Sequence, residues 1–112
     1  MIDPFALHPG VGETWGYVEE NVLARGVVDQ DVKELCLRVA RGEDVDPGAY
    51  EGRERAAVEW AHAIVWDADL ATDGLWERLH AQFSEPELVD LGCAVGFELG
   101  RNHFLRTLPR SH

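Results

Sequence analysis

The fold is decided by one stretch near the end of the chain, Ser84-Glu-Pro-Glu-Leu-Val-Asp-Leu-Gly-Cys-Ala-Val-Gly-Phe-Glu-Leu-Gly-Arg-Asn-His-Phe-Leu-Arg-Thr-Leu108. Ser84 followed by Glu87 is a capping box, in which each side chain serves a backbone amide at the start of a helix. Pro86 fits the first turn, where no amide hydrogen is needed. The apolar residues that then recur at helical spacing are Leu88, Leu91, Val95 and Leu99. The stretch therefore predicts one long helix with a buried face.

The rest of the chain is helical in pattern as well. Apolar periodicity, capping residues and glycine stops predict four earlier helices, at about residues 12–25, 30–41, 51–66 and 73–83. Residues 1–11 contain two prolines and are expected to form an extended arm that lies on another surface or on a partner subunit. Residues 43–50 are expected to form an acidic loop, because Asp-Pro-Gly favours a turn. The prediction is a single all-α domain, residues 1–112, of about five helices.

Charge and composition exclude several classes of partner. The chain has 112 residues and a formal net charge of -11, with 21 acidic against 10 basic residues. Phosphate groups would be repelled, so we expect no nucleic acid and no membrane as a partner. No segment approaches the roughly 20 apolar residues of a membrane span, and the start lacks the pattern of a signal peptide. A cytoplasmic location is expected. Cys36 and Cys93, in separate predicted helices, are expected to be buried free thiols.

Two Glu-x-x-His pairs have the spacing that di-iron carboxylate bundles use, namely Glu59 with His62 and Glu77 with His80. On a helical wheel both glutamates point away from the apolar side of their helices. Metal ligands must converge on one point, so this arrangement argues against a dinuclear site. We therefore expect no metal and no cofactor.

The end of the last helix places polar groups along its apolar stripe. At about 100° per residue, Asn102 and Arg106 continue the stripe, His103 lies beside it and Glu98 lies on its margin. His103 and Glu98 are candidate catalytic residues for general acid/base chemistry. Asn102 and Arg106 are candidates for binding a carbonyl or carboxylate substrate. The alternative is that these groups pair with one another, or with polar residues of the third helix, as a seam between subunits.

Two residues of the third predicted helix complete the predicted substrate-binding set. Glu54 lies one turn before Val58 and is expected on the inward side, where a carboxylate is costly unless paired. It is either half of a structural ion pair or a second pocket carboxylate. His62 lies on the flank of the same helix.

Three glycines of the last helix, Gly92, Gly96 and Gly100, are spaced four apart. Each weakens a helix by about 1 kcal/mol relative to alanine, so something must compensate. Close approach of another helix is favoured over open volume for a ligand. Together with four tryptophans and the arm, the glycines indicate a homo-oligomer.

Several short segments resemble one known family when taken in order. They are His8-Pro-Gly10, Val32-Lys-Glu-Leu-Cys-Leu-Arg-Val-Ala40, Arg53-Glu-Arg-Ala-Ala57, Phe83-Ser-Glu-Pro-Glu-Leu-Val-Asp-Leu91, Val95-Gly-Phe97 and Arg101-Asn102. Over nearly its whole length the chain resembles the carboxymuconolactone decarboxylase and alkylhydroperoxidase D-like family. The resemblance implies an all-helical fold that assembles into trimers or hexamers.

The chain departs from that family at one motif. Members of the peroxidase type carry a Cys-x-x-Cys-x-x-x-His helix where this chain has Arg41-Gly-Glu-Asp-Val-Asp-Pro-Gly48. Thiol peroxidase activity is therefore not expected. The resemblance implies a cofactor-independent, lyase-type enzyme that acts on a small carbonyl or carboxylate molecule by proton transfer, in decarboxylation, isomerisation or elimination. The alternative is a non-catalytic helical oligomer that binds a ligand or a partner protein.

Overall fold

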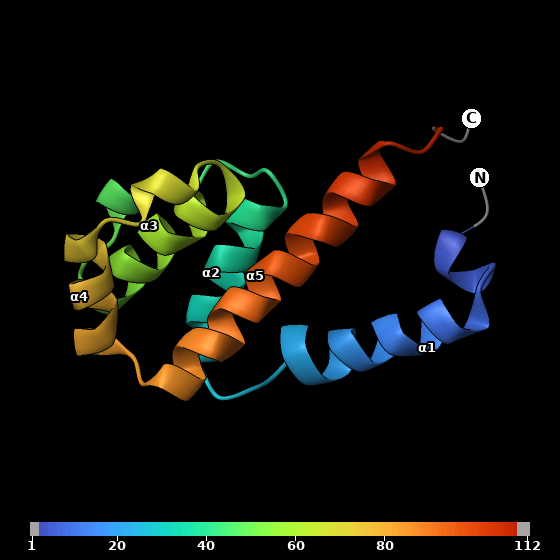
Figure 1. Cartoon of the computed structure of the whole chain (residues 1–112), viewed down its shortest axis with the longest axis horizontal. Coiled ribbons are helices and arrows are strands. Elements are labelled where there is room, and N and C mark those ends of the chain that lie inside the picture. Colours follow the sequence, from blue (N-terminus) through green and yellow to red (C-terminus); the bar gives the residue numbers. More distant parts are fainter. Residues whose placement is uncertain (1–2, 110–112) are drawn as a thin grey trace.

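The computed structural model describes residues 3–109, which are helical nearly throughout (Figure 1). The α-helices run Pro9–Val18 (α1), Gln30–Ala40 (α2), Gly52–Val65 (α3), Asp73–Gln82 (α4) and Glu85–Arg106 (α5). A 3-10 turn, Pro4–Ala6 (η1), precedes α1, and three further turns lie between the helices: the π-helical turn Glu19–Leu23 (η2) and the 3-10 turns Pro47–Ala49 (η3) and Ala68–Leu70 (η4). Residues 3–109 contain no strand, so the predicted all-α class with five helices is confirmed.

The start of the chain is not the extended arm that the sequence predicts. Over the described residues 3–11 it is helical, because both prolines stand in the first turn of a helix instead of breaking one. Asp3 caps η1 by accepting a hydrogen bond from the amide of Phe5 (3.0 Å). The Nδ1 atom of His8 accepts one from the amide of Val11 (3.1 Å), so α1 begins at Pro9. Residues 1–2 lie outside the described part.

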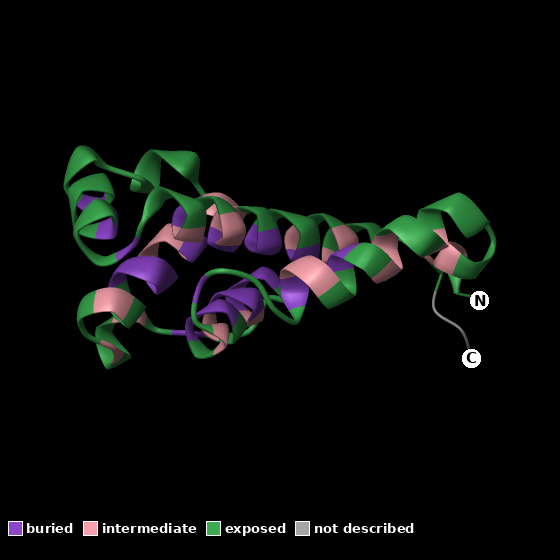
Figure 2. Cartoon of the chain, turned by 90° about the horizontal axis from the view of Figure 1, so that it is seen from below, coloured by how far each residue is buried: buried purple, intermediate pink, exposed green. Residues whose placement is uncertain are grey.

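The core lies between α2, α3, α4 and the first half of α5. Helix α2 packs on both α3 and α5, and α4 packs on α3. Buried residues face the space between these helices, as the purple segments of Figure 2 show. The largest apolar side chains that are almost completely buried are Leu37, Leu79, Leu91, Val39, Val58 and Val95. The leucine and valine stripe of α5 is therefore the core face that its spacing predicts.

Helix α1 and the second half of α5 project from this body toward the same end of the molecule (Figure 1). The molecule is elongated as a result, at 43 × 26 × 22 Å. Aromatic groups join the two projecting helices. The ring of Phe5 stacks on Trp15 at 5.7 Å and lies 6.3 Å from the ring of Phe104. The guanidinium of Arg101 lies over Trp15 at 5.2 Å.

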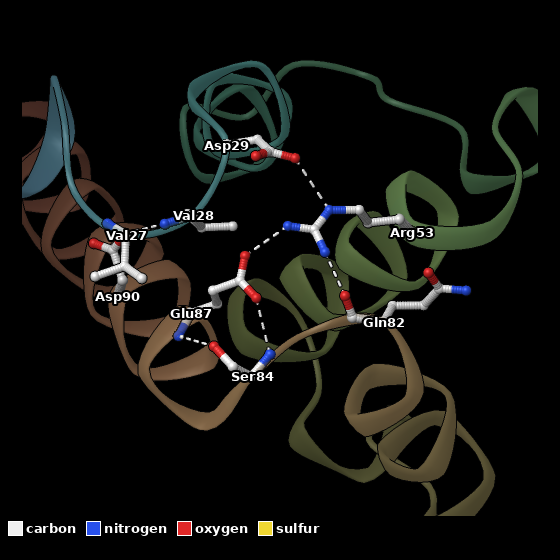
Figure 3. Close-up of polar contacts among 8 residues, drawn as sticks. All are labelled: Val27, Val28, Asp29, Arg53, Gln82, Ser84, Glu87 and Asp90. Atoms are coloured by element: carbon white, nitrogen blue, oxygen red, sulfur yellow. Dashed lines mark hydrogen bonds and ion pairs between the residues drawn. The ribbon is translucent and has the colours of Figure 1, made fainter.

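The start of α5 is held by the capping box that the sequence predicts. Ser84 Oγ accepts from the amide of Glu87 (3.3 Å), and Glu87 Oε1 accepts from the amide of Ser84 (2.9 Å). Arg53 of α3 extends this contact (Figure 3), because its guanidinium binds Glu87 (2.7 Å), Asp29 (3.1 Å) and the carbonyl of Gln82. One arginine thus ties the start of α2 and the end of α4 to the start of α5.

A buried ion pair fixes the link between η2 and α2. Lys33 is fully buried, and its Nζ donates to Asp90 Oδ1 (2.8 Å) and to the carbonyls of Val22 (2.7 Å) and Arg25 (3.0 Å). The other oxygen of Asp90 accepts from two amides, those of Val27 (2.7 Å) and Val28 (2.9 Å) (Figure 3). All three ammonium hydrogens are therefore used. We call this arrangement the Lys33–Asp90 clamp.

Acid is expected to destabilise the fold through Asp90 and Glu87. Burial alone would raise the pKa of Asp90, but the hydrogen bonds from Lys33, Val28 and Val27 and the charge of Lys33 outweigh it, so the pKa lies below the ordinary value of 3.8. The pKa of Glu87 lies below 4.5, because the Ser84 amide and the Arg53 guanidinium bind its carboxylate. The unfolded chain therefore takes up these protons at a higher pH than the folded chain.

This stabilisation is complete at neutral pH and is lost as the pH falls below the ordinary values and through the lowered ones. The urea midpoint of unfolding should accordingly drop between about pH 6 and about pH 3. In Asp90→Asn the fall should be shallower. A midpoint that stays constant over this range would contradict the assignment.

Candidate functional site

Glu98 lies where α5 leaves the body of the molecule. It is 2% exposed. Its Oε1 accepts a hydrogen bond from Arg101 NH1 (3.2 Å), and its Oε2 lies 3.9 Å from Arg41 NH2 at the end of α2. The side chains of both arginines are about one third exposed and reach water. Glu98 is thus a buried carboxylate whose two cationic partners stay partly solvated.

His103 does not join Glu98 within the chain. The two residues are five positions apart on α5, which places them about 140° apart around the helix. His103 is exposed, whereas Glu98 faces α2. The expectation that the apolar stripe continues to include His103 is therefore wrong, because α2 ends at Ala40 and no longer covers the second half of α5. A shared catalytic role for His103 and Glu98 stays a prediction.

Asn102 and Arg106 lie near the same junction. Asn102 is half-buried, and its Oδ1 is buried with no hydrogen-bond partner among the described residues. Arg106 is exposed, and its guanidinium lies against Gly42, just after α2. Of the arginines near this junction, Arg41 and Arg101 pair with Glu98, and Arg41 also lies 3.6 Å from Glu34.

Glu54 is not on the inward side of α3 as predicted. It is exposed and forms no ion pair with the described residues, whereas its neighbour Arg53 is half-buried. The reason is that Glu54 stands in the first turn of α3, where no other helix covers its side. The core face of α3 begins only at Ala56. The predicted inward position of Glu54 and its structural ion pair are therefore wrong within the described chain, and its role as a substrate-binding carboxylate stays a prediction.

His62 is held in a fixed position beside a cavity. Its Nε2 lies 2.7 Å from the carbonyl oxygen of Val45, in the acidic loop. A carbonyl only accepts hydrogen bonds, so Nε2 carries the proton and Nδ1 is the basic nitrogen of the neutral ring. The ring lines a cavity of about 400 Å³ together with Pro47, Glu59, Leu70, Thr72, Leu75 and Arg78. We call this cavity the α3/α4 pocket.

The other polar groups of the α3/α4 pocket come from both helices. Arg78 NH1 of α4 lies 2.5 Å from Glu59 Oε2 of α3. Thr72 Oγ1 caps α4 by accepting from the amide of Leu75 (3.2 Å), and its own hydrogen stays available for a ligand. The pocket thus combines a histidine base, an ion pair and a hydroxyl with apolar walls, as small-molecule sites do. The Glu59/His62 spacing was the only sequence signal for it, since Arg78 and Thr72 are contributed by another helix.

The two cysteines differ in their surroundings. Cys36 is buried, as predicted, and burial raises the pKa of its thiol to about 12. Cys93 is exposed, so the expectation that it is buried is wrong. It lies on a side of α5 that no other helix of the described chain covers at that point. Within residues 3–109, no three histidine, cysteine, aspartate or glutamate side chains converge as they would around a metal ion.

Comparison with family models, with curated proteins and with solved structures finds no match to this chain. The resemblance to the carboxymuconolactone decarboxylase-like family therefore stays a prediction from the short segments quoted above. Of the helices in the described part, none combines the length and the apolar character needed to cross a membrane.

Proposed function

We propose that the chain is a cofactor-independent enzyme that moves protons on a small carbonyl or carboxylate substrate, and that the reaction takes place in the α3/α4 pocket. The observation that carries the proposal is the contact between His62 Nε2 and the carbonyl of Val45. It fixes the tautomer and the orientation of the ring, as the orienting partner of a general base does. His62 takes the place of His103 as the acid/base residue, because His62 has both a fixed ring and a cavity.

The pocket residues divide the work as follows. Nδ1 of His62 removes a proton from the carbon next to the substrate carbonyl, and the electron pair of that C–H bond moves toward the carbonyl oxygen. Arg78 and the hydroxyl of Thr72 stabilise the negative charge that develops there. Return of the proton to a different carbon gives isomerisation, and loss of a leaving group gives elimination. In decarboxylation the imidazolium of His62 protonates the carbon that loses CO₂.

A test that needs no known substrate is solvent deuterium exchange. In D₂O the enzyme should exchange the hydrogens next to the carbonyl in at least one member of a panel of small keto acids and unsaturated lactones. Proton NMR follows the loss of the C–H signal. In His62→Gln the exchange rate should fall by about 100-fold or more, the usual contribution of a general base.

His80→Gln provides the matched control. His80 lies on α4, is exposed, and contacts Trp76 of its own helix, through the carbonyl oxygen (3.0 Å) and edge-on against the ring (4.7 Å between centroids), outside the α3/α4 pocket. Its replacement should leave the exchange rate unchanged. The proposal fails if the wild-type protein exchanges no member of the panel, or if His62→Gln and His80→Gln have the same rate. Far-ultraviolet circular dichroism checks that both variants are folded.

A second candidate function is a non-catalytic homo-oligomer that binds a ligand or a partner protein. It is favoured by large apolar side chains that α5 leaves exposed, those of Val89, Phe97 and Phe104. The resemblance implies a trimer or a hexamer for either function. For the non-catalytic protein, small carboxylates should shift the NMR signals of the α3/α4 pocket without deuterium exchange.

A further inference from the structure

One face of α5 is uncharged along its middle and has little cover within the chain. Within about 140° of arc it carries Val89, Gly92, Cys93, Gly96, Phe97, Gly100 and Phe104. The exposed fractions of Val89, Phe97 and Phe104 are 65%, 44% and 45%. A methyl group added at Gly96 or Gly100 would meet nothing within 4 Å. We call this surface the α5 open face. Its lack of charge stands out in a chain of which 28% is charged.

The open face contains both a hollow and a projecting side chain. The hollow has a volume of about 300 Å³ and is lined almost entirely by apolar atoms of Trp60, Trp76, Leu88, Val89, Gly92 and Cys93. Its floor is close-packed, because a methyl group at Gly92 would lie only 2.9 Å from the ring of Trp60. Phe97 projects from the same face about one turn farther along α5. The hollow and Phe97 thus lie on opposite edges of the open face.

We propose that the α5 open face binds the same face of a second copy, with the two helices antiparallel and the two-fold axis passing near Ala94. Gly92 and Gly96 are each two residues from Ala94, so this register lays glycine on glycine and lets the helix backbones approach closely. It also places Phe97 of each copy beside Cys93 of the other, because both residues lie on the half of the open face away from Gly92. Phe97 then loses its exposure to water in the contact, as interface anchors do.

Charge supports the same register. Glu85 and His103 are each nine residues from Ala94, and they lie on the same edge of the open face. In an antiparallel pair the same edges meet, so Glu85 of each copy lies opposite His103 of the other, an acidic group against a basic one. Elsewhere, a net charge of -11 makes two copies repel each other. The middle of the open face carries no charged side chain, so contact through it adds no further repulsion between like charges.

The proposal does not depend on the α3/α4 pocket, and it constrains the assembly. A two-fold pair gives a dimer, or a hexamer built from three such pairs. It does not give a trimer whose only symmetry is a three-fold axis. The exposed His103, which does not meet Glu98 in its own chain, becomes part of the subunit seam.

Sedimentation velocity at micromolar concentration tests the pairing through two substitutions. Phe97→Asp should raise the dissociation constant of the pair by about thirtyfold or more, because it places a charge inside the apolar contact. Gly96→Leu should weaken association as well, yet it should raise the helix stability of the separated chain, since a Cβ atom there meets nothing within 4 Å and leucine favours a helix over glycine. Weaker association together with a more stable separated chain distinguishes the loss of an interface from a general folding defect.

A charge swap tests the register. Glu85→Lys removes the acidic group opposite His103, and His103→Glu places two carboxylates opposite each other, so each change should weaken the pair. The double variant restores opposite charges and should recover most of the affinity. The affinity should not recover in the double variant if Glu85 or His103 affects only the stability of its own helix.

Cross-linking gives an independent measurement. Cys93 lies one residue from the axis in each copy, so the two thiols are offset along the helices by about 3 Å. Mild oxidation should join wild-type chains in pairs through a Cys93–Cys93 disulfide and should fail with Cys93→Ser. The proposal is overturned if the protein is a monomer or a trimer in solution, if Phe97→Asp and Gly96→Leu both leave association unchanged, or if the charge swap fails to recover it.

Discussion

Replacing Lys33 by methionine is expected to lower the free energy of unfolding by about 3–5 kcal/mol, the usual loss when one partner of a buried ion pair is removed. The side chain of Asp90 is only 10% exposed and would lose its cation. The carbonyls of Val22 and Arg25 would lose their hydrogen-bond donor in the same step. Methionine fills a similar volume, so the loss reports the missing charge and hydrogen bonds rather than a cavity. Urea unfolding measures it directly.

Glu98→Met is the matched control for Lys33→Met. It also replaces a buried charged side chain by methionine, but the partners of Glu98 are Arg41 and Arg101, whose side chains are 37% and 33% exposed. These guanidinium groups can return to water when the carboxylate is removed, so no charge is left buried and unpaired. We expect a change of less than about 1 kcal/mol, or a small gain. Equal losses in the two variants, measured at one protein concentration, would show that the Lys33–Asp90 clamp has no special role.

Local rules explain what could be predicted from the sequence. The capping box of Ser84 and Glu87, the proline after it and the spacing of Leu88, Leu91 and Val95 all act within a few residues. The cap of α4 by Thr72 is of the same kind. These rules predict where helices begin and which face they bury. They also account for the difference at the start of the chain, where Pro9 is the first residue of a helix, a position that proline favours.

The candidate site could not be predicted in the same way, because its contacts join distant parts of the chain. Lys33 and Asp90 are 57 residues apart, and His62 meets Val45 across 17 residues. A helical wheel gives the direction of a side chain but not what lies in front of it. Glu98 and His103 illustrate this limit, since the end of α2 covers the first, whereas the second is exposed among the described residues 3–109. The sequence therefore predicts helix α5 correctly, but it does not predict how far α2 extends along that helix.

Cys93 is expected to react with a thiol reagent faster than Cys36 by a factor of about 1,000 or more. Only the thiolate attacks the reagent, and burial raises the pKa of Cys36 to about 12 while excluding the reagent itself. Cys36 can react only when the chain opens, which for a domain of ordinary stability is a rare state. Mass spectrometry of the native protein with iodoacetamide should show one label per chain at first, and two after unfolding in urea.

The concentration dependence of the Cys93 label links this measurement to the α5 open face. In the proposed pair Cys93 lies near the two-fold axis and is covered, so its labelling rate should rise on dilution and should be highest in Phe97→Asp. In Cys93→Ser the native protein should take up almost no label at any concentration. Equal rates for Cys36 and Cys93 would contradict the packing of α2 against α5. A Cys93 rate that does not change with concentration or with Phe97→Asp would mean that the second copy, if bound, leaves this face of α5 uncovered.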